Sequence, residues 1–573
     1  MIYPATLLCD FYKISHRKQY PEKTQRIYAT WTPRTSRKVG IDKVVFFGLQ
    51  GFIKEYLIEY FSKNFFYRKL EDVVAEYKRV IKNTLGEEDP DASHIIALHK
   101  LGYLPIEIKA LPEGTLTPIK VPMFTIENTV DEFFWVTNYL ETLLSCMLWQ
   151  PMTSATISLE YRKILDKYAL ETVGNTSGVK FCGHDFSMRG MSSLESAKIS
   201  GAGHLLSFVG TDTIPSILYV EEFYNANIEE ELIGTSIPAT EHSVQCCYGQ
   251  EEEINTFKRL ITEVYPKGIV SVVSDTWDLW KVLTEYLPEL KSTIMNRDGK
   301  LVIRPDSGDP VKILCGDIDI INLNDKVRCL QEANCYFGRM AWNYFSDKVM
   351  QLLHDKKEYN FTLNEKFYKA ECVPHFKIEK DMFKKDCRYV LNDVEVNIKE
   401  IELTPANKGV VQLLWETFGG TTTKKGYKLL DQHIGCIYGD AITLERCKEI
   451  CEKLKEKGFA STNMVYGMGS YSFQFNTRDT FGFAMKTTYA VVDGEERFLF
   501  KNPITDNGVK KSQKGRVAVV NSEDFKALEL VDGLNKEEEE TYKDNLLQTV
   551  FRNGHLLVDD NFNEIRQRVQ IHL

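Results

Sequence analysis

Arginine and aspartate side chains directly follow a hydrophobic run in residues 301–310, which read LVIRPDSGDP. A turn after a strand needs only Pro305 and Gly308, so Arg304 and Asp306 require a further, chemical reason. A guanidinium group matches the oxygens of a phosphate, and carboxylates suit sugar hydroxyls or a magnesium ion held through water. The stretch therefore indicates contact with a phosphorylated sugar.

Four other short runs end in residues of the same kind. They are VKFCGHDF (179–186), IVSVVSDT (269–276), IGCIYGD (434–440) and NMVYGMGS (463–470). Such runs are typical of parallel strands whose carboxyl ends form one active-site face, as in α/β barrels. We therefore expect one site to be lined by two arginines, two histidines, four aspartates and a glycine turn: Arg189, Arg304, His184, His242, Asp212, Asp275, Asp306, Asp440, Gly467 and Gly469.

Two local motifs have alternative interpretations. GMGSYS (467–472) is part of a GxGxxG pattern, but a dinucleotide-binding domain needs that pattern after an early strand, and here it lies near the end of the chain. A phosphate cup in barrel loops fits its position better. In IPATEHSV (237–244), Glu241 precedes His242. A single histidine is more often structural, yet beside an anionic leaving group it can act as an acid, a phosphate ligand or a phosphoryl acceptor.

Hydrophobic periodicity indicates the elements that position these residues. Helical periodicity is clear in residues 50–61, 132–149 and 445–457. Strand-like stretches at 103–114 and 121–129 lie between proline and glycine residues. The front part of the chain therefore predicts a mixed α+β domain, and the part after it predicts alternating strands and helices.

This pattern and the length of 573 residues predict an α/β fold class with several parts. We expect residues 1–150 to form the α+β domain, with the tail 487–573 packed against it. Residues 151–486 are expected to form an irregular α/β barrel that carries the site. Within the barrel, the alternation lapses over residues 311–423, which we interpret as an inserted subdomain.

The insertion and the tail contain further motifs. The insertion holds five cysteines and His375, and CVPH (372–375) has the spacing of zinc ligands. Because no second paired motif accompanies it, ordinary buried thiols are the favoured interpretation. In the tail, the acidic run NKEEEETYKDN (535–545) predicts a solvated face or loop. The basic stretch NPITDNGVKKSQKGR (502–516) is either a solvated loop or a functional segment.

Composition excludes several classes of protein. A formal net charge of -10 argues against a general binder of nucleic acid or anionic membranes, since both need a broad basic surface. The first residues show no basic region followed by an apolar core, and no run approaches about 18 consecutive apolar residues. The thirteen cysteines are odd in number and form no CxxC pair, which argues against a disulfide scaffold. We expect a soluble, cytoplasmic protein.

Motifs along nearly the whole chain, in order, match one family. The matching stretches are LLCDFYKISHRKQYP (7–21), YLPIEIKALPEG (103–114), HDFSMRG (184–190), GTDT (210–213), SIPATEHS (236–243), VSVVSDTWD (270–278), IRPDSGDP (303–310), KGYKLL (425–430), YGD (438–440), FNTRD (475–479) and LLQTVFRNG (546–554). Together they make the chain resemble the nicotinamide phosphoribosyltransferase family, which are type II phosphoribosyltransferases. The insertion after Pro310 departs from the vertebrate-like form of that family.

The resemblance implies transfer of phosphoribose from phosphoribosyl pyrophosphate to nicotinamide, which gives nicotinamide mononucleotide and pyrophosphate in NAD salvage. It implies Mg²⁺, and ATP as a co-substrate that phosphorylates His242. Glu241, Asp275 and Lys510 would lie around this histidine. It also implies a homodimer whose shared active sites are completed by the partner's N-terminal segment.

Individual roles are carried over by matching positions. Phe186 and the partner subunit's Tyr12 would stack on the pyridine ring, and Asp212 would accept a hydrogen bond from the carboxamide. Asp306 would hold the ribose hydroxyls, and Arg304 would face the ring or the pyrophosphate, as would Arg189. The catalytic set would be His242, Asp306, Arg304 and Asp275. Further substrate-binding positions would be Asp10, His184, Ser236, Ser271, Gly439, Asp440, Gly469, Ser470, Arg478 and Lys486, with metal ligands unassigned.

Asp212 predicts which substrate is used. A carboxylate gains a hydrogen bond from a carboxamide but meets a like charge on nicotinate. Two alternatives remain open: a nicotinate phosphoribosyltransferase, and a non-catalytic barrel that only binds its ligand. A metal-dependent barrel hydrolase would need a ligand cluster such as HxH, which the sequence lacks.

Overall fold

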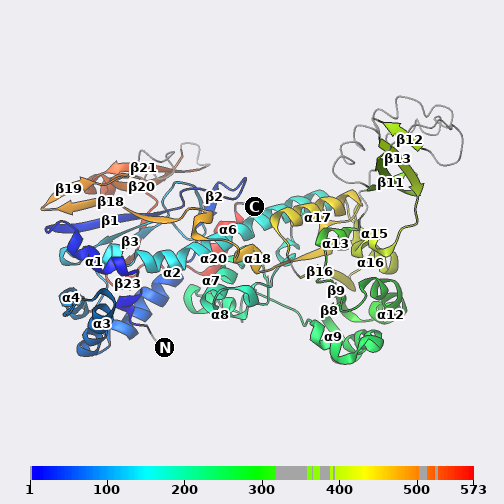
Figure 1. The fold of residues 1–573 in the computed structure, drawn as a ribbon, viewed down its shortest axis with the longest axis horizontal. Helices are drawn as coiled ribbons and strands as arrows, with labels where there is room; N and C mark the ends of the chain where they lie inside the picture. The colour runs from blue at the N-terminus through cyan, green and yellow to red at the C-terminus, as the bar shows by residue number, and fades with distance from the viewer. Residues whose placement is uncertain are drawn as a thin grey trace. The chain divides into compact units, whose positions relative to one another are not determined.

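The computed structural model divides into two compact units (Figure 1). One unit contains a sheet whose strands come from both ends of the chain, and the other contains parallel strands from residues 267–468. The structure describes residues 3–317, 358–363, 366–374, 388–391, 394–439, 441–501, 513–522 and 527–573. Unit 1 comprises residues 1–163, 183–236 and 468–573, and unit 2 comprises residues 164–182 and 237–467. These divisions differ from the predicted boundaries at 150 and 486, because helix α6 (Glu141–Thr172) runs through residue 150 without a break.

A seven-stranded antiparallel sheet organises unit 1, in the order β19-β18-β1-β5-β3-β22-β23. Its strands come from both ends of the chain, as the register pairs Thr30 with Lys486 and Lys109 with Thr549 show. The predicted α+β domain built from the N-terminal part and the tail is therefore confirmed. These strands are β1 (Thr24–Thr32), β3 (Ile106–Ala110), β5 (Phe124–Asn128), β18 (Ala484–Val492), β19 (Glu495–Phe498), β22 (Gln548–Arg552) and β23 (His555–Leu556).

Helices cover the rest of unit 1, and the C-terminal helix α20 packs into its core. Phe562, Ile565 and Val569 of α20 are buried in one apolar cluster with residues of α6, α7 and α8. Strands β6 and β7 form a short parallel pair, and in the chain α7 follows β6 and α8 follows β7. The remaining elements are α1 (Phe11–Gln19), β2 (Lys43–Val45), α2 (Leu49–Phe52), the π-helical η2 (Ile53–Tyr60) and η3 (Ser62–Phe66), α3 (Leu70–Leu85), α4 (Ser93–Leu101), β4 (Leu116–Pro118), α5 (Val136–Tyr139), β6 (Gly183–Asp185), η6 (Met188–Gly190), α7 (Leu194–His204), β7 (Gly210–Thr211), α8 (Ile214–Tyr224), α18 (Ser470–Phe473), η11 (Arg478–Thr480), β20 (Arg516–Asn521), β21 (Leu528–Leu534), α19 (Lys536–Thr541) and α20 (Phe562–Gln570).

Unit 2 contains four parallel strands in the order β17-β16-β9-β8. Runs such as VSVV and LVIR are rich in β-branched residues and become buried strands, as expected for a sheet covered by helices. The predicted α/β class is confirmed. The elements are α9 (His242–Tyr248), α10 (Glu253–Arg259), η8 (Leu260–Val264), β8 (Lys267–Val273), α11 (Leu279–Lys281), η9 (Val282–Tyr286), α12 (Leu287–Met295), β9 (Asp298–Arg304), α13 (Pro310–Cys315), α15 (Pro405–Lys408), α16 (Val410–Phe418), β14 (Gly420–Thr422), β15 (Lys428–Leu430), β16 (Ile434–Tyr438), α17 (Leu444–Glu456) and β17 (Met464–Met468).

The predicted insertion includes a four-stranded antiparallel sheet in the order β10-β11-β13-β12. It is formed by β10 (Glu358–Leu363), β11 (Lys366–Pro374), β12 (Arg388–Leu391) and β13 (Val394–Glu400). The two ends of the predicted insertion, 311–423, are part of the helical packing of unit 2 instead, because α13 and α16 bury apolar residues such as Leu314 and Leu414 there. Among the described helices, none is both long and apolar enough to cross a membrane.

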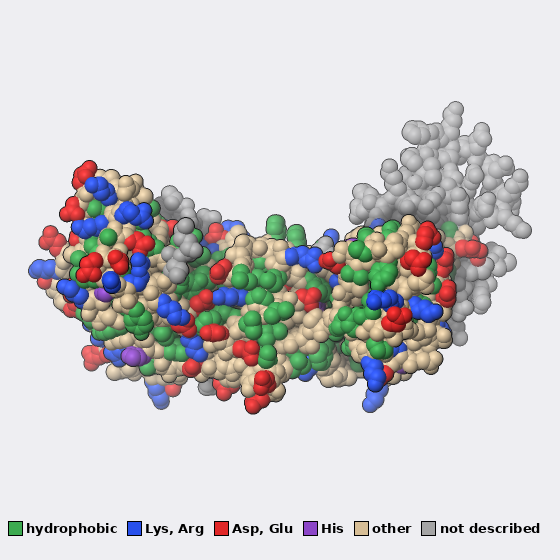
Figure 2. Space-filling view, turned by 90° about the horizontal axis from the view of Figure 1, so that it is seen from below, with side chains coloured by type: hydrophobic (Ala, Val, Ile, Leu, Met, Phe, Trp, Pro, Cys, Tyr) green, Lys and Arg blue, Asp and Glu red, His purple; other side chains and the backbone are tan. Residues whose placement is uncertain are grey.

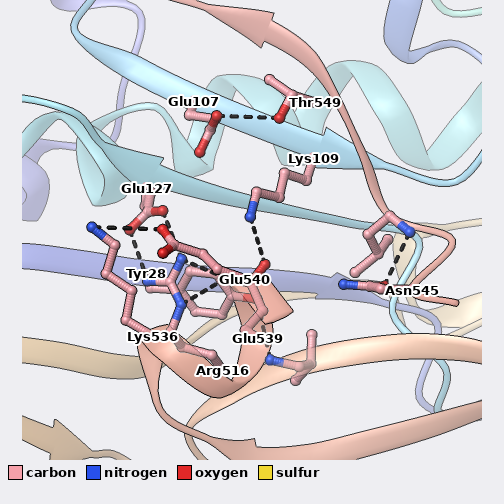
Figure 3. A network of polar contacts seen from close by, with 12 residues as sticks. Tyr28, Glu107, Lys109, Glu127, Arg516, Lys536, Glu539, Glu540, Asn545 and Thr549 are labelled. Atoms are coloured by element: carbon pink, nitrogen blue, oxygen red, sulfur yellow. Dashed lines mark hydrogen bonds and ion pairs between the residues drawn. The ribbon is translucent and has the colours of Figure 1, made fainter. Parts of the chain in front are cut away.

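The acidic run of the tail is not entirely solvated. Glu539 is 3% exposed, and its carboxylate accepts hydrogen bonds from Arg516 Nε at 2.9 Å and Lys109 Nζ at 2.7 Å (Figure 3). Arg516 also binds both oxygens of Glu127, at 2.9 and 2.7 Å. The prediction of a solvated face is therefore wrong for Glu539, because β20 places a buried cation beside it. The other three glutamates of the run are exposed.

Glu113, in the turn after β3, is buried and holds the start of α2. Its carboxylate accepts hydrogen bonds from the backbone N–H of Gly48 at 3.0 Å, from that of Gln50 and from the hydroxyl of Tyr224 at 3.2 Å. Burial raises the pKa of Glu113 to about 7, although these hydrogen bonds oppose the shift. Folding therefore favours the protonated carboxyl.

This shift predicts a pH dependence of stability. The folded pKa of about 7 lies above the ordinary value of 4.5, so the contribution of Glu113 is fully present below pH 4.5 and is lost as the pH rises through 7. The difference amounts to about 3 kcal/mol at most. We expect the free energy of unfolding of the wild type, measured in urea and taken relative to that of Glu113→Gln, to be lower at about pH 8 than at about pH 5. Parallel pH profiles for the two proteins would contradict the assignment.

Candidate functional site

The first group of predicted site residues lies in unit 1, where β6 and β7 end. The strands are parallel, with His184 opposite Gly210, and the backbone N–H of Asp212 donates to the Asp185 carbonyl at 2.9 Å. His184 Nε2 lies 2.8 Å from Asp212 Oδ1, and the hydroxyl of Ser236 donates to the same oxygen. The structure thus brings two predicted residues, His184 and Ser236, onto the carboxylate of a third, Asp212.

An aromatic ring flanks this carboxylate group. The rings of Phe186 and His184 have centroids 4.5 Å apart and are tilted by 33°. Phe186 is half-buried, and its backbone N–H donates to the Met468 carbonyl at 3.0 Å. Arg189 is exposed two positions after the buried Ser187. A ring face beside a hydrogen-bonding carboxylate suits a flat heteroaromatic ligand that carries a polar donor.

The predicted glycine turn lies against the same segment. A Cβ atom at Gly190 would lie 2.1 Å from the hydroxyl oxygen of Ser470, so only glycine leaves room for that side chain. Gly469 immediately precedes α18, which Ser470 begins. The predicted Ser470 thus lies against Gly190 of the segment that carries Phe186 and Arg189, although the two residues lie 280 positions apart in the sequence.

The second group lies in unit 2, around His242 at the start of α9. Its Nδ1 lies 3.1 Å from the hydroxyl of Thr276, and its Nε2 lies 3.9 Å from both Asp275 Oδ1 and Asp306 Oδ2. Two carboxylates beside one imidazole nitrogen can stabilise positive charge on the ring or share a hydrated cation. Sequence reasoning missed Thr276, although it directly follows the predicted Asp275.

Asp275 also connects the ends of β8 and β9. Its Oδ2 accepts hydrogen bonds from the backbone N–H groups of Asp306 at 2.8 Å and Ser307 at 2.7 Å, and from the Ser307 hydroxyl at 2.5 Å. The side chain of Asp275 is 5% exposed. This carboxylate therefore fixes the loop that follows LVIR and so the position of Asp306.

Three buried polar atoms at these strand ends lack a hydrogen-bond partner among the described residues. They are Ser271 Oγ, Asp275 Oδ1 and Arg304 Nε, while Arg304 Nη2 donates to the Thr240 carbonyl at 2.8 Å. Buried polar groups in native proteins are nearly always satisfied. A donor and acceptors left unsatisfied together, near His242, indicate a place for a polar ligand.

Gly439, after β16, adjoins the same group. A Cβ atom there would lie 2.7 Å from Asp306 Oδ1. Because the backbone N–H of Asp306 is bound to Asp275, the backbone at Asp306 is fixed and a larger residue at position 439 would push the Asp306 carboxylate aside. Asp440 and Lys510 lie outside the described residues. Glu241 is exposed, and its carboxylate accepts a hydrogen bond from the hydroxyl of Ser243.

Cations gather around Lys486 in unit 1. Burial lowers the pKa of Lys486, and the charges of Arg34, Lys501 and Arg478 lower it further against the opposing effect of Glu141. Gathered cations of this kind favour the binding of an anion. Arg34 and Lys501 were missed by sequence reasoning, which had no local signal because only the pairing of β1 with β18 brings residue 34 near residue 486.

The predicted N-terminal residues lie on the surface of unit 1. Tyr12 is 56% exposed on α1, and Asp10 accepts a hydrogen bond from the hydroxyl of Thr142 at 2.9 Å. The next residue, Lys13, is 4% exposed and pairs with Glu141, which holds α1 in place. Tyr12 is therefore presented outward on an anchored helix.

The described residues contain no group of three or more His, Cys, Asp and Glu side chains placed to hold a metal ion. A magnesium ion here would be held mainly by ligand phosphates and water, with one or two carboxylates. Of the insertion's cysteines, Cys315 is a buried thiol whose pKa is raised to about 12 by burial. The side chains of the other four and of His375 lie outside the described part, so the zinc alternative stays a prediction there.

Two family descriptions match the chain. The nicotinate phosphoribosyltransferase (NAPRTase) family matches residues 181–350 and 376–555, and the nicotinamide phosphoribosyltransferase N-terminal domain matches residues 5–108. A nicotinamide phosphoribosyltransferase from Acinetobacter baylyi is 45% identical over 571 residues, covering 98% of this chain and 96% of that protein. One from Mycoplasma pneumoniae is 32% identical over 525 residues, covering 89% and 94%. The crystal structure of human nicotinic acid phosphoribosyltransferase aligns with 99% of this chain and 93% of that chain at a TM-score of 0.46 and 13% identity.

Proposed function

Because the chain belongs to the nicotinamide phosphoribosyltransferase family, we propose that it transfers the 5-phosphoribosyl group of phosphoribosyl pyrophosphate to nicotinamide. The products are nicotinamide mononucleotide and pyrophosphate, so the chain is a pentosyltransferase of NAD biosynthesis. One observation carries the choice of acceptor. The Asp212 carboxylate, held by His184 and Ser236 beside the Phe186 ring, offers an acceptor to the NH₂ of a pyridine carboxamide.

The bond changes explain the residue types. The anomeric C–O bond breaks with its electron pair leaving on pyrophosphate, and the pyridine nitrogen supplies the pair for the new C–N bond. Positive charge develops on the sugar, as in other glycosyl transfers. Arg304 would stabilise the departing pyrophosphate, and Asp306 would hold the ribose hydroxyls. Each such preorganised contact is worth about 3–4 kcal/mol of barrier.

The nucleophile is a neutral ring nitrogen, so no general base is needed. Positioning takes the place of deprotonation, and a ring held against Phe186 would be oriented for attack. Mg²⁺ would enter as part of the substrates, bound to their phosphates. The residues present fit this, since Asp275 and Asp306 each place a carboxylate oxygen 3.9 Å from His242 Nε2, and Asp275 Oδ1 has no hydrogen-bond partner among the residues that the structure describes.

We also propose that ATP phosphorylates His242. The terminal phosphoryl group would pass from ATP to an imidazole nitrogen, with one O–P bond broken, one N–P bond formed and ADP released. The contacts with Thr276, Asp275 and Asp306 support this role, because they orient the ring and can stabilise its charge. Lys510 and Glu241 remain predicted neighbours of this histidine.

A homodimer with shared active sites is a further proposal. Hydrophobic side chains reach the surface in several places (Figure 2), and in unit 1 these include Phe11, Tyr12, Tyr471 and Phe475. Tyr471 and Phe475 stack on each other while 55% and 71% exposed. Exposed aromatic groups of this kind suit burial against a second chain. The cations around Lys486 would then complete a phosphate site across the interface.

A cytoplasmic location is proposed on chemical grounds. The nine cysteines whose side chains the structure describes are free thiols, which persist in a reducing compartment.

The proposed activity is tested by product analysis. Purified protein incubated with nicotinamide, phosphoribosyl pyrophosphate and Mg²⁺ is expected to form nicotinamide mononucleotide and pyrophosphate in equal amounts, identified by mass spectrometry. A parallel reaction with nicotinate is expected to give little product. Formation of nicotinate mononucleotide alone would favour a nicotinate phosphoribosyltransferase, and absence of both products would favour a non-catalytic barrel.

The role of His242 predicts a covalent adduct. Incubation with Mg-ATP is expected to add one phosphate that is lost in acid, as measured by intact mass, and His242→Ala is expected to abolish it. His433→Ala serves as the control, because His433 is also a partly buried histidine of unit 2 and pairs with Asp431. An adduct that survives in His242→Ala would place the phosphoryl group elsewhere.

The contact between Gly439 and Asp306 predicts a specific loss. In Gly439→Ala the new methyl group would displace the Asp306 carboxylate, so we expect kcat/KM for phosphoribosyl pyrophosphate to fall about a hundredfold while nicotinamide affinity is unchanged. Gly435→Ala on β16 is the matched control, since its Cβ would meet the flexible Lys300 side chain at 3.2 Å and Val302 at an ordinary contact distance of 3.5 Å. Equal kinetics for both variants would refute this contact.

A further inference from the structure

His184 is closely packed between Gly210 and the Phe186 ring, next to Asp212. Its side chain is 10% exposed, and a Cβ atom at the facing Gly210 would lie 2.8 Å from His184 Nδ1. The glycine therefore leaves just enough room for the imidazole, whose other side faces the Phe186 ring. The ring cannot rotate freely, so the direction of Nε2 is fixed toward Asp212.

The protonation of this contact follows from its chemistry. An ionised carboxylate only accepts hydrogen bonds, so the contact of His184 Nε2 with Asp212 Oδ1 at 2.8 Å requires the hydrogen to be on Nε2. The hydroxyl of Ser236 donates to the same oxygen. Two donors from separate segments of the chain thus converge on Oδ1.

These two donors restrict the rotation of the Asp212 carboxylate. The Asp212 side chain is 45% exposed, and the torsion that turns a carboxylate is broad and weakly restrained. A freely turning carboxylate would present either an in-plane lone pair or its flat face to the ligand. Anchoring Oδ1 from two sides fixes the plane of the group and so the direction of Oδ2.

We propose that His184 is a specificity-positioning residue: its Nε2–H donor orients the Asp212 carboxylate for the carboxamide of the substrate. This inference rests on the proposed function. His184 acts through Asp212 and need not touch the reacting atoms.

Two substitutions separate the donor from the ring. In His184→Gln the amide NH₂ can replace Nε2–H, but the aromatic ring is lost. In His184→Phe the ring is retained against Phe186, but the donor is lost. We expect His184→Phe to lower the ratio of kcat/KM for nicotinamide over nicotinate about tenfold or more, mainly through KM, and His184→Gln to keep most of the wild-type ratio.

Each outcome bears on a different statement. If the wild type forms no nicotinamide mononucleotide, the proposed function fails and the ratio has no meaning. If the wild type prefers nicotinamide but His184→Phe keeps the same ratio, the positioning role is refuted. If His184 is purely structural, both variants will unfold at a changed temperature, and their folded protein will keep the wild-type ratio of the two kcat/KM values. That result also overturns the proposal. Loss of affinity for both substrates in His184→Gln alone would assign a stacking role instead.

Discussion

Replacing Asp212 by serine is expected to lower the preference for nicotinamide over nicotinate by about a hundredfold, measured as the ratio of the two kcat/KM values. The carboxylate of Asp212 would face the carboxylate of nicotinate across a partly desolvated pocket. Two like charges about 4 Å apart repel by about 1 kcal/mol in water and about 4 kcal/mol near a protein surface. Because Asp212 is 45% exposed, the effect should lie between these limits.

The substitution should act on both substrates in opposite directions. Use of nicotinamide should fall, because its NH₂ loses an acceptor, and use of nicotinate should rise, because a repulsive charge is removed. Asp212→Asn is the matched control, since it keeps the shape and the contact with Ser236 but not the charge. If both variants retain the wild-type ratio, the choice of substrate is made elsewhere.

Replacing Arg516 by methionine is expected to destabilise the protein by about 3–5 kcal/mol, the usual cost of removing one partner from a buried ion pair. Arg516 is 1% exposed and binds Glu127 and Glu539 (Figure 3). Its removal would take this partner from both carboxylates and leave Glu539 with its ion pair to Lys109. Burial opposes ionisation of Glu127, yet Arg516 holds the pKa of that carboxyl below its usual value. The guanidinium also lies over the Tyr28 ring at 4.3 Å.

Urea unfolding followed by circular dichroism measures this cost. Lys536→Ala is the control, because Lys536 pairs with Glu540 at 3.7 Å on the surface beside the same network, where both side chains are about half exposed. Exposed pairs contribute about 0–1 kcal/mol, so the control should unfold almost as the wild type does. An Arg516→Met protein as stable as the control would mean that the tail is not held by this network.

The strands that carry the site were predictable from sequence because their signal is local. LVIRPDSG and IVSVVSDT are short β-branched runs closed by polar residues, and they form β9 and β8 with Arg304, Asp275 and Asp306 at or just after their ends. The helix α17 was predictable for the same reason, since Cys447, Ile450, Cys451 and Leu454 recur at helical spacing and are all buried.

Contacts that depend on distant pairing were not predictable. Arg34 joins Lys486 only because β1 and β18 pair across most of the chain, whereas Lys501 follows the neighbouring strand β19. Glu539 looks like any member of an acidic run, and only the docking of β20 and α19 buries it against Arg516. Thr276 is inconspicuous in sequence until the fold places its hydroxyl 3.1 Å from His242.

A crystal structure of the protein with nicotinamide mononucleotide and pyrophosphate tests the central claim most directly. The account predicts the carboxamide nitrogen within about 2.7–3.2 Å of an Asp212 carboxylate oxygen, with the pyridine ring against Phe186. A pyridine ring bound away from Asp212, or a carboxamide that faces Asp212 with its oxygen only, would contradict it.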